Sequence, residues 1–558
     1  MAPAAPATPD AYAPVTTPRD VADAAPAPRR RFKLVIGAVV LVGVVLVAVG
    51  AVVYTFRTKV QTHASDILTN IQQSPGLKIT VTAKRESMRF NGQSSAQFYV
   101  VPRPGDAFSF DAVVAQAGPE VVERYLLLDG RAYWSVAKDD NVVASGCLEA
   151  SQLPPVELVA SSVATASVVD AVTGDAITVD DCPDGKLLQL TFAGDSFVFC
   201  NSPSNRLTKA ASADLDVAVE YLRDASLLPS MDPPTGVSCP VVVGPSVPAP
   251  AATLVQTGRA ISSALFGGPR VAAVSKSSCA CKSTPKPCLF VHGVGETASM
   301  PLQNSYPDMW GSIEEHAPCC TSVKFARFET TLRGWDNADL QNQFCDAARS
   351  VAGTRAGAPI DNLLLVAHSM GNLIAGSAVA SGKCAFGNGV TWVSIAGPLQ
   401  GSKTANALEE KCASGGGAIS FKSLLGSAGL CPITAAYVSL KHETTVDDGM
   451  RAKFAAAQAV RQKYASRVMC GTSSMGLATW KGVGLAGIGK LSGHDSNHDG
   501  VVDLPSCAVG IDRRKFGADA ASSLHYEASI NHLDTSFRNG DGWWGADRKP
   551  IKWFECSL

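Results

Sequence analysis

The 558-residue sequence has almost no net charge and no basic stripe. Its 48 Lys and Arg residues nearly balance its 49 Asp and Glu residues, which gives a formal net charge of -1 at pH 7. Basic residues gather in one short cluster only, made of Arg29, Arg30, Arg31 and Lys33. Proteins that bind nucleic acid usually carry a basic patch that neutralises phosphates. We therefore predict that this protein does not bind nucleic acid.

The N-terminal residues have few large apolar side chains, and the chain as a whole has no internal repeat. A repeat of about 20 to 50 residues would mark a solenoid, and none is present. Residues 1–31 are mostly Ala, Pro and Thr. Such a segment cannot bury enough apolar surface to offset the loss of chain entropy on folding. We predict a disordered tail over residues 1–33.

Residues 34–54, LVIGAVVLVGVVLVAVGAVVY, contain no charged side chain. At about 1.5 Å per residue, this segment is long enough to cross a hydrocarbon core of about 30 Å. A secretory signal peptide is the alternative, but it would lie closer to the N-terminus and end in a small-residue cleavage site. We predict a transmembrane helix, a signal anchor. The basic cluster before it outweighs Arg57 and Lys59 after it, which places the tail in the cytoplasm and the rest in the lumen or outside the cell.

Cysteine is absent before Cys147, and all 16 cysteines lie between Cys147 and Cys556. They fall on the side of the membrane that we expect to be oxidising, and an even number suits disulfides. Zinc is the competing use. Cys279-Ala-Cys281 and the adjacent Cys319-Cys320 lack the paired CxxC spacing of most tetrahedral sites. The sequence predicts disulfides without indicating their pairing.

Residues 61–227 contain short runs in which apolar and polar residues alternate, such as LKITVTA, AQFYVV and RYLLLDGRAYWSV. A period of two predicts strands, and Asp129-Gly130 between two such runs predicts a hairpin turn. We predict a mainly antiparallel β domain with a binding, spacer or substrate-presenting role; a sheet that holds a lipid is the alternative. Residues 228–287 concentrate Pro, Gly and Ser, which indicates a linker that cysteines attach to the rest of the chain.

From residue 288 to the C-terminus, apolar runs such as CLFVHG, NLLLVAHS and VTWVSIAG alternate with helical stretches. Strands that alternate with helices predict right-handed crossovers and a mostly parallel sheet with helices on both faces. We predict one α/β domain over residues 288–558. Three tryptophans near its end, Trp543, Trp544 and Trp553, are expected to pack against the sheet rather than contact a membrane.

Ser369 lies in Ala367-His368-Ser369-Met370-Gly371, after an apolar strand and before a small-residue helix. In a Gly-x-Ser-x-Gly turn, small neighbours allow the serine to occupy a strained position between strand and helix. Alanine at the first position keeps the residue small. The segment resembles the nucleophile elbow of the α/β-hydrolase family, especially of lipases. The alternative for Ser369 is an ordinary helix cap.

A second segment, His292-Gly293-Val294-Gly295, resembles the HG-x-G turn of the same family. The resemblance implies that backbone N–H groups of Val294 and Met370 bind the developing oxyanion, and that His292 is structural. The family's chain order is serine, then acid, then histidine.

Asp499-Gly500-Val501-Val502 resembles the turn in which lipases place the triad acid. Only His525 and His532 follow it. Alternation over residues 524–530 predicts a last strand that carries His525, with His532 in the loop beyond, where the base belongs. We predict a triad of Ser369, Asp499 and His532, with Asp503 and His525 in reserve.

The acid segment has a competing interpretation as a calcium loop. Asp495, Asn497, Asp499 and Asp503 match the start of the D-x-N-x-D-G pattern, in which oxygens at alternate positions bind a hard cation. Position 12 is Ser506 instead of a bidentate Glu. If calcium is bound, Asp499 becomes a ligand and the acid shifts to Asp503. No other cofactor is expected.

The resemblance implies a membrane-anchored serine hydrolase that cleaves carboxylic esters, in particular lipids, through an acyl-enzyme. An acyltransferase or a thioesterase on the same triad is an alternative within enzymes. A non-catalytic binding module that keeps only the scaffold is an alternative of another class. The sequence gives no acyl chain, head group or oligomeric state.

Overall fold

The computed structural model of the chain describes residues 64–89, 93–103, 109–118, 121–150, 153–155, 158–173, 177, 179–243, 271–273, 279–413, 431–477, 485, 489–490 and 492–558. All of them belong to one compact unit, Val60–Leu558. The predicted tail (1–33) and transmembrane helix (34–54) lie outside the described residues, as does much of the predicted linker. Among the helices of the described part, none is both long enough and apolar enough to span a membrane.

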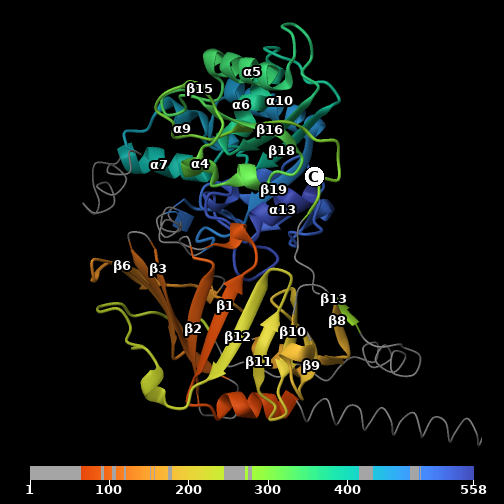
Figure 1. Cartoon of the computed structure of the whole chain (residues 1–558). Coiled ribbons are helices and arrows are strands. Elements are labelled where there is room, and N and C mark those ends of the chain that lie inside the picture. The colour runs from red at the N-terminus through yellow and green to blue at the C-terminus, as the bar shows by residue number, and fades with distance from the viewer. Residues whose placement is uncertain are drawn as a thin grey trace, which may run out of the picture. The chain divides into compact units, whose positions relative to one another are not determined.

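Eleven strands of the N-terminal half form one antiparallel sheet (Figure 1), as the alternating pattern predicts. Its order is β6-β5-β4-β3-β2-β1-β12-β11-β10-β9-β7. The strands are β1 (Leu77–Ala83), β2 (Ser95–Pro102), β3 (Phe110–Ala117), β4 (Val122–Leu128), β5 (Arg131–Lys138), β6 (Asn141–Cys147), β7 (Ser167–Val169), β9 (Lys186–Phe192), β10 (Asp195–Asn201), β11 (Leu207–Ala211) and β12 (Leu215–Tyr221). Two short strands, β8 (Ala171–Thr173) and β13 (Val271–Ala273), pair separately.

The predicted hairpin turn at Asp129-Gly130 is confirmed. β4 ends at Leu128, β5 begins at Arg131, and Leu128 pairs with Arg131. Both turn residues have positive φ, 53° for Asp129 and 69° for Gly130. This is the two-residue turn whose twist matches that of the flanking strands.

The C-terminal half contains an eight-stranded sheet of order β15-β16-β14-β17-β18-β19-β21-β20. Only β15 runs antiparallel to its neighbour. The strands are β14 (Lys286–Val291), β15 (Met300–Gln303), β16 (Cys320–Arg327), β17 (Leu363–His368), β18 (Val390–Ile395), β19 (Ala465–Gly471), β20 (Phe516–Gly517) and β21 (His525–Ala528). The mostly parallel sheet that the sequence predicts is therefore present, and its first strand begins two residues before residue 288.

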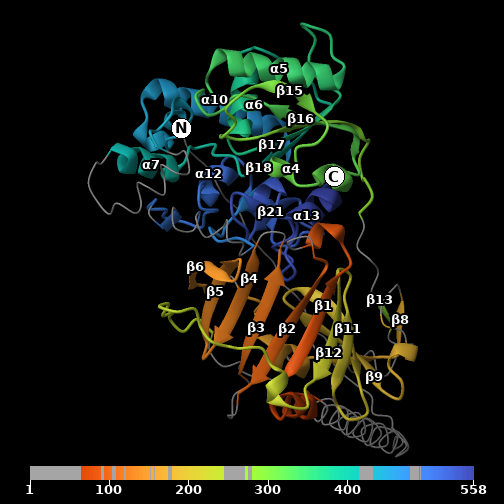
Figure 2. The same cartoon turned by 60° about the vertical axis from the view of Figure 1, so that its left-hand side comes forward.

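Helices cover both faces of this sheet (Figure 2). The apolar cluster on one face includes residues of α5 (Ala338–Ala352), α6 (Met370–Ala380) and α10 (Asp448–Tyr464). The cluster on the other face includes residues of α4 (Pro307–Trp310) and α13 (Pro550–Ser557). Every residue of β17 is buried, because helices lie above and below it. Shorter helices are α7 (Lys403–Ala413), α9 (Ala435–Ser439) and α12 (Leu504–Ala508).

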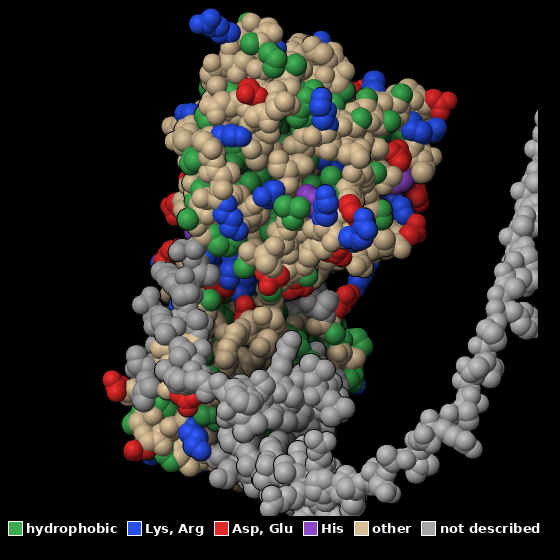
Figure 3. Space-filling model, turned by 90° about the vertical axis from the view of Figure 1, so that its right-hand side faces the viewer, with side chains coloured by type: hydrophobic (Ala, Val, Ile, Leu, Met, Phe, Trp, Pro, Cys, Tyr) green, Lys and Arg blue, Asp and Glu red, His purple; other side chains and the backbone are tan. Residues whose placement is uncertain are grey.

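All sixteen cysteines form disulfides, as predicted. The pairs are Cys147–Cys239, Cys182–Cys200, Cys279–Cys556, Cys281–Cys319, Cys288–Cys320, Cys345–Cys384, Cys412–Cys431 and Cys470–Cys507. Disulfides in this number form and persist in oxidising compartments. They indicate a luminal or extracellular environment for the part of the chain that carries them. The face in Figure 3 shows Lys and Arg interspersed with Asp and Glu, in line with the small net charge.

A buried ion cluster joins the end of the chain to the first sheet. Lys549 is 1% exposed and contacts Asp195 of β10 at 3.0 Å and Asp214 at 2.9 Å. Lys552 of α13 contacts the same Asp214 carboxylate at 2.6 Å. Burial lowers the pKa of Lys549, but the two carboxylates outweigh burial and raise it above its usual value. Lys549 is therefore a charged ammonium inside the protein.

The tryptophans near the C-terminus pack differently from the prediction. Trp553 is fully buried in the apolar cluster of the α/β sheet. Trp543 and Trp544 instead join the apolar cluster of the first sheet, which also contains Ile67 and Met88. The indole N–H of Trp543 donates to the carbonyl of Met88. The expectation was wrong for these two residues, because a loop of the α/β half extends onto the antiparallel sheet.

Candidate active site

Ser369 occupies a strained turn between β17 and α6. Its backbone has φ 53° and ψ -130°, which L-residues with side chains rarely adopt. A Cβ at Gly371 would lie 2.7 Å from the carbonyl oxygens of both Val291 and His292, so only glycine fits there. Ala367 is fully buried, and its small side chain fits where glycine is usual. This is the backbone geometry of a nucleophile elbow.

Asn372 fixes the elbow from within α6. Its Nδ2 lies 2.9 Å from the carbonyl oxygen of Ala367, 3.2 Å from that of Ser369 and 3.0 Å from that of Ile395. These carbonyls belong to the strand before the turn, to the turn residue itself and to the neighbouring strand β18. In the sequence, Asn372 is only the residue that follows Gly371 of the elbow motif. Its bonds across the turn become visible only when the strand and the helix are packed together.

His532 lies between Ser369 and Asp499. Its Nε2 is 2.8 Å from Ser369 Oγ, and its Nδ1 is 2.7 Å from Asp499 Oδ2. All three side chains are buried. His532 therefore connects the other two predicted triad residues, which gives the spatial order serine, histidine, acid.

Asp499 is held by backbone groups on its other oxygen. Oδ1 accepts from the N–H of Val501 at 2.9 Å and from that of Val502 at 2.7 Å. The N–H of His532 donates to the carbonyl of Asp499 at 2.9 Å. The acid is thus fixed both in position and in the oxygen that faces the imidazole.

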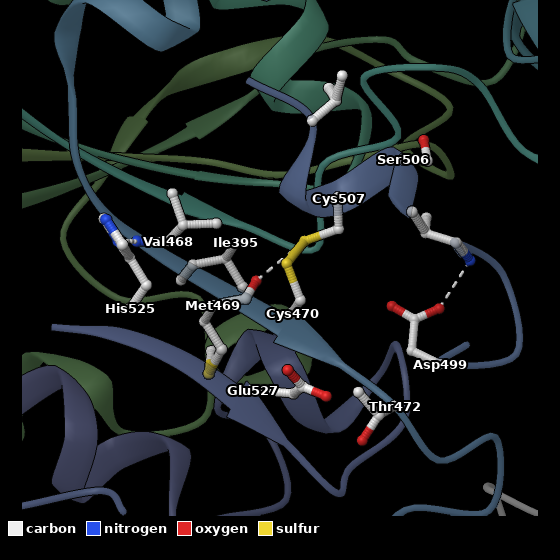
Figure 4. Close-up of a disulfide and its surroundings, with 12 residues drawn as sticks. Ile395, Val468, Met469, Cys470, Thr472, Asp499, Ser506, Cys507, His525 and Glu527 are labelled. Atoms are coloured by element: carbon white, nitrogen blue, oxygen red, sulfur yellow. Dashed lines mark hydrogen bonds between the residues drawn. A yellow bond between two sulfur atoms is a disulfide. The ribbon is translucent and has the colours of Figure 1, made fainter. Parts of the chain in front are cut away.

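A disulfide links β19 to α12, and the segment that carries Asp499 lies between these two elements in the chain. Cys470 of β19 and Cys507 of α12 form it, and Figure 4 shows Asp499 beside them. A Cβ at Gly471, the last residue of β19, would lie 2.7 Å from the Cβ of Asp499. The absence of a side chain at Gly471 therefore leaves the space in which Asp499 packs against the end of β19.

The HG-x-G turn lies directly against the nucleophile. A Cβ at Gly293 would be 2.6 Å from the Cβ of Ser369. Met370 is the first residue of α6, so its N–H has no partner within the helix. The structure thus brings the turn that contains Val294 and the start of α6 to the same serine. Their role in binding an oxyanion remains a proposal.

His292 orients the backbone of this turn. Its Nδ1 is 2.7 Å from the carbonyl oxygen of Gly293, and its Nε2 accepts from the N–H of Phe328 at 2.9 Å. Complete burial lowers the pKa of the imidazole to about 4. A neutral ring with the proton on Nδ1 satisfies both contacts.

His368 supports the loop of the base and was not singled out by the sequence. Its Nε2 is 3.0 Å from the carbonyl oxygen of His532 and 3.1 Å from Thr535 Oγ1. Burial, followed by the nearby His532, lowers the pKa of His368 well below its usual value. The position before the serine was visible in the motif, but its partner 164 residues away was not.

The two reserve residues lie elsewhere. His525 is in β21, where its Nδ1 accepts from the N–H of Val468 at 3.1 Å. Figure 4 shows His525 and Asp499 on opposite sides of the Cys470–Cys507 disulfide. Asp503 contacts His494 Nδ1 at 2.7 Å. The structure brings neither reserve residue to Ser369 or His532.

The residues of the calcium pattern do not converge. Asp495 pairs with Lys403 at 2.5 Å, Asp503 pairs with His494, and Asp499 faces His532. Within the described residues, no group of three or more His, Cys, Asp or Glu side chains could hold a metal ion. The donor set therefore does not fit a calcium loop, because its carboxylates point to different partners.

Acid should destabilise the fold in part through His525. Burial first, then the charges of Arg467 and Lys515, lower its pKa from 6.5 to about 4. A lowered folded pKa means that the unfolded chain binds the extra proton, so stability is complete above pH 6.5 and declines toward pH 4. We expect His525→Gln, whose amide oxygen can still accept from the N–H of Val468, to make the free energy of unfolding less dependent on pH. The reduction in slope should correspond to at most one proton taken up on unfolding. Urea unfolding between pH 4 and pH 7 with disulfides intact measures the slope; an unchanged slope would contradict the assignment.

The sheet and the turn at Ser369 together indicate which known fold the C-terminal half resembles. A mostly parallel sheet carries a serine at positive φ after a central strand, and the next two partners follow in the order acid, then histidine. In fold, the chain resembles the α/β-hydrolases. Within that fold, the serine lies at the carboxyl end of a strand, where open α/β sheets bind their ligands.

No family model and no curated protein matches the chain. Staphylococcus hyicus lipase is 14% identical, with 49% of this chain and 95% of that chain covered and a TM-score of 0.27. Phospholipase PlaB from Legionella pneumophila is 15% identical over 40% of this chain and 44% of that chain, with a TM-score of 0.26. LprF from Mycobacterium bovis is 11% identical over 32% of this chain and 98% of that chain, with a TM-score of 0.21. These TM-scores are too low to support an argument about function.

Proposed function

We propose that the protein is a serine hydrolase that cleaves carboxylic esters, in particular lipid esters, through an acyl-enzyme on Ser369. The observation that carries the proposal is the pair of contacts of His532, 2.8 Å to Ser369 Oγ and 2.7 Å to Asp499 Oδ2, at a serine with φ 53°. An ordinary helix cap explains neither the strained backbone nor the two partners, and Ser369 makes no side-chain cap bond to α6.

Acylation begins when Ser369 Oγ attacks the ester carbonyl carbon. His532 Nε2 takes the hydroxyl proton, and Asp499 holds Nδ1–H and stabilises the imidazolium. The carbonyl oxygen becomes an oxyanion, for which the N–H groups of Val294 and Met370 are the proposed donors. Collapse of this intermediate breaks the ester C–O bond, and His532 gives its proton to the departing alcohol.

Deacylation repeats the sequence with water. His532 Nε2 removes a proton from a water molecule, whose oxygen attacks the acyl carbon. The bond to Ser369 Oγ then breaks, and the serine recovers its proton from His532. The products are one carboxylic acid and one alcohol, which balance the ester and the water consumed.

We also propose that the chain is anchored in a membrane. Residues 34–54 would anchor the chain, with the N-terminus in the cytoplasm and the catalytic half in the lumen or outside the cell. The eight disulfides support that orientation, because such bonds are rare in the cytosol.

Labelling with a fluorophosphonate probe tests the assignment of Ser369. We expect the wild type to form a covalent adduct that peptide mass spectrometry places on Ser369, and Ser369→Ala to form none. Ser381→Ala, at the other end of α6, is the matched control and should label like the wild type. Equal labelling of the Ser369→Ala variant, or none of the wild type, would exclude the proposal. Release of free acid from an ester, with and without an added alcohol acceptor, separates hydrolysis from acyl transfer.

A further inference from the structure

The antiparallel sheet forms the wall of a partly open apolar cavity that the triad does not use. Its volume is about 440 Å³, within the range of about 300 to 1,000 Å³ of small-molecule sites. The residues that line it do not include Ser369, His532 or Asp499. Apolar side chains are normally packed against one another, so a concave apolar surface of this size needs an explanation.

The cavity wall is built from one face of the sheet. Val81 of β1, Phe98 of β2, Val114 of β3 and Val217 of β12 line it. Their neighbours at every second position, such as Ile79 of β1, also line it, since alternate side chains of a strand share a face. The wall is almost wholly apolar.

Helical segments and a loop from the α/β half complete the wall. Ile71 of the helix at 64–72 and Val163 of α2 (Val159–Ala164) contribute from the first half. Leu477, Trp543 and Trp544 contribute from the second half, and both tryptophans pack on the apolar cluster of the first sheet. Residues from both halves of the chain, each with its own sheet, therefore line the cavity.

Two polar groups of the lining residues have no hydrogen-bond partner within the described part of the chain. They are the indole Nε1 of Trp544 and the hydroxyl of Tyr221, and both atoms are buried. Buried donors are normally paired, so an unpaired one in a cavity wall marks a position for an acceptor. An ester or carboxyl oxygen is such an acceptor.

We propose that this cavity binds an acyl lipid, with the hydrocarbon chain against the sheet and a carbonyl oxygen near Trp544. A peptide is disfavoured, because each residue brings an N–H and a C=O that need partners, and the central strands already pair on both sides. A hydrocarbon chain needs no such partners and gains from leaving water. The site lies outside the triad, so the inference goes beyond the proposed function and does not depend on it.

Titration with cis-parinaric acid, a fatty acid whose fluorescence rises in apolar surroundings, tests the inference on the full chain. We expect saturable binding near one to one for the wild type and for Ser369→Ala. Binding should also persist after Ser369 is blocked by a long-chain fluorophosphonate. Loss of binding after blocking would place the acyl chain in the active site and overturn the inference. Absence of saturable binding would overturn it too. Failure of fluorophosphonate labelling, in contrast, would concern only the proposed hydrolase activity.

A matched pair of variants tests whether the fatty acid probe binds in this cavity. Val114→Trp fills the cavity and should weaken binding by roughly tenfold or more, because the added ring occupies the space of the acyl chain. Val142→Trp makes the same change at an exposed position of β6, where Val142 is 60% exposed, and should bind like the wild type. Near-UV circular dichroism confirms that both variants fold. Trp544→Phe, which keeps the ring but removes the N–H, serves as a second variant and should weaken binding of the acid. Equal affinity of Val114→Trp and Val142→Trp would overturn the inference.

Discussion

Replacing Asp499 with asparagine is expected to lower kcat for ester hydrolysis about 10⁴-fold, the size of effect seen when a triad acid is neutralised elsewhere. Oδ1 of Asp499 accepts two backbone N–H groups, from Val501 and Val502. An amide can satisfy these donors only with its oxygen, so its NH₂ group would face His532 Nδ1. The imidazole would then carry its proton on Nε2, which could no longer accept the proton of Ser369. Steady-state kinetics on a soluble ester measures the loss.

Asp503→Asn is the matched control for this prediction. Asp503 lies four residues away, is buried, and contacts His494 instead of His532. We expect its kcat to stay close to that of the wild type once circular dichroism shows that the variant is folded. A large loss in Asp503→Asn together with a small one in Asp499→Asn would reverse the assignment of the acid.

Lys549→Met is expected to cost about 3 to 5 kcal/mol of stability, the usual result of removing one partner from a buried ion pair. The ammonium is 1% exposed and lies 3.0 Å from Asp195 and 2.9 Å from Asp214. Without it, the Asp195 and Asp214 carboxylates each lose an ammonium partner. The free energy of unfolding from urea titration, with disulfides intact, measures the effect.

Two variants control this second prediction. Lys453→Met removes an exposed ammonium from its pair with Asp336, and such surface pairs contribute about 0 to 1 kcal/mol. Lys549→Met combined with Asp195→Leu removes both partners and should be less destabilising than the sum of the single changes. A loss in Lys549→Met no larger than in Lys453→Met would mean that the cluster does not stabilise the fold.

The sequence indicated the site well wherever its signals were local. The elbow around Ser369 was visible because a strand, a serine and small residues are contiguous. The turn at Asp499 and the loop at His532 followed from the same kind of short pattern. The calcium pattern over residues 495–503 was equally local. It gave no information about Lys403 and His494, which pair with two of its carboxylates in the structure.

The support around the triad could not be predicted in the same way. His368 contacts the loop of His532, 164 residues later, and Asn372 bonds to Ile395 of the next strand. Neither contact leaves a trace in the spacing of residues along the chain. The structure places His525 in a strand and His532 in the loop beside Ser369, as the strand alternation predicted.

The sequence by itself determined the two kinds of sheet, the turn at Asp129-Gly130, the use of cysteine in disulfides and the position of the serine. Each of these rests on a period, a turn residue or a count, which short stretches of chain encode. The tertiary structure decided the eight disulfide pairings, the packing of Trp543 and Trp544 on the first sheet, and the contact of Lys549 with Asp214, 335 residues earlier. Such contacts form only when distant segments are brought together, and burial then selects which charges and rings meet.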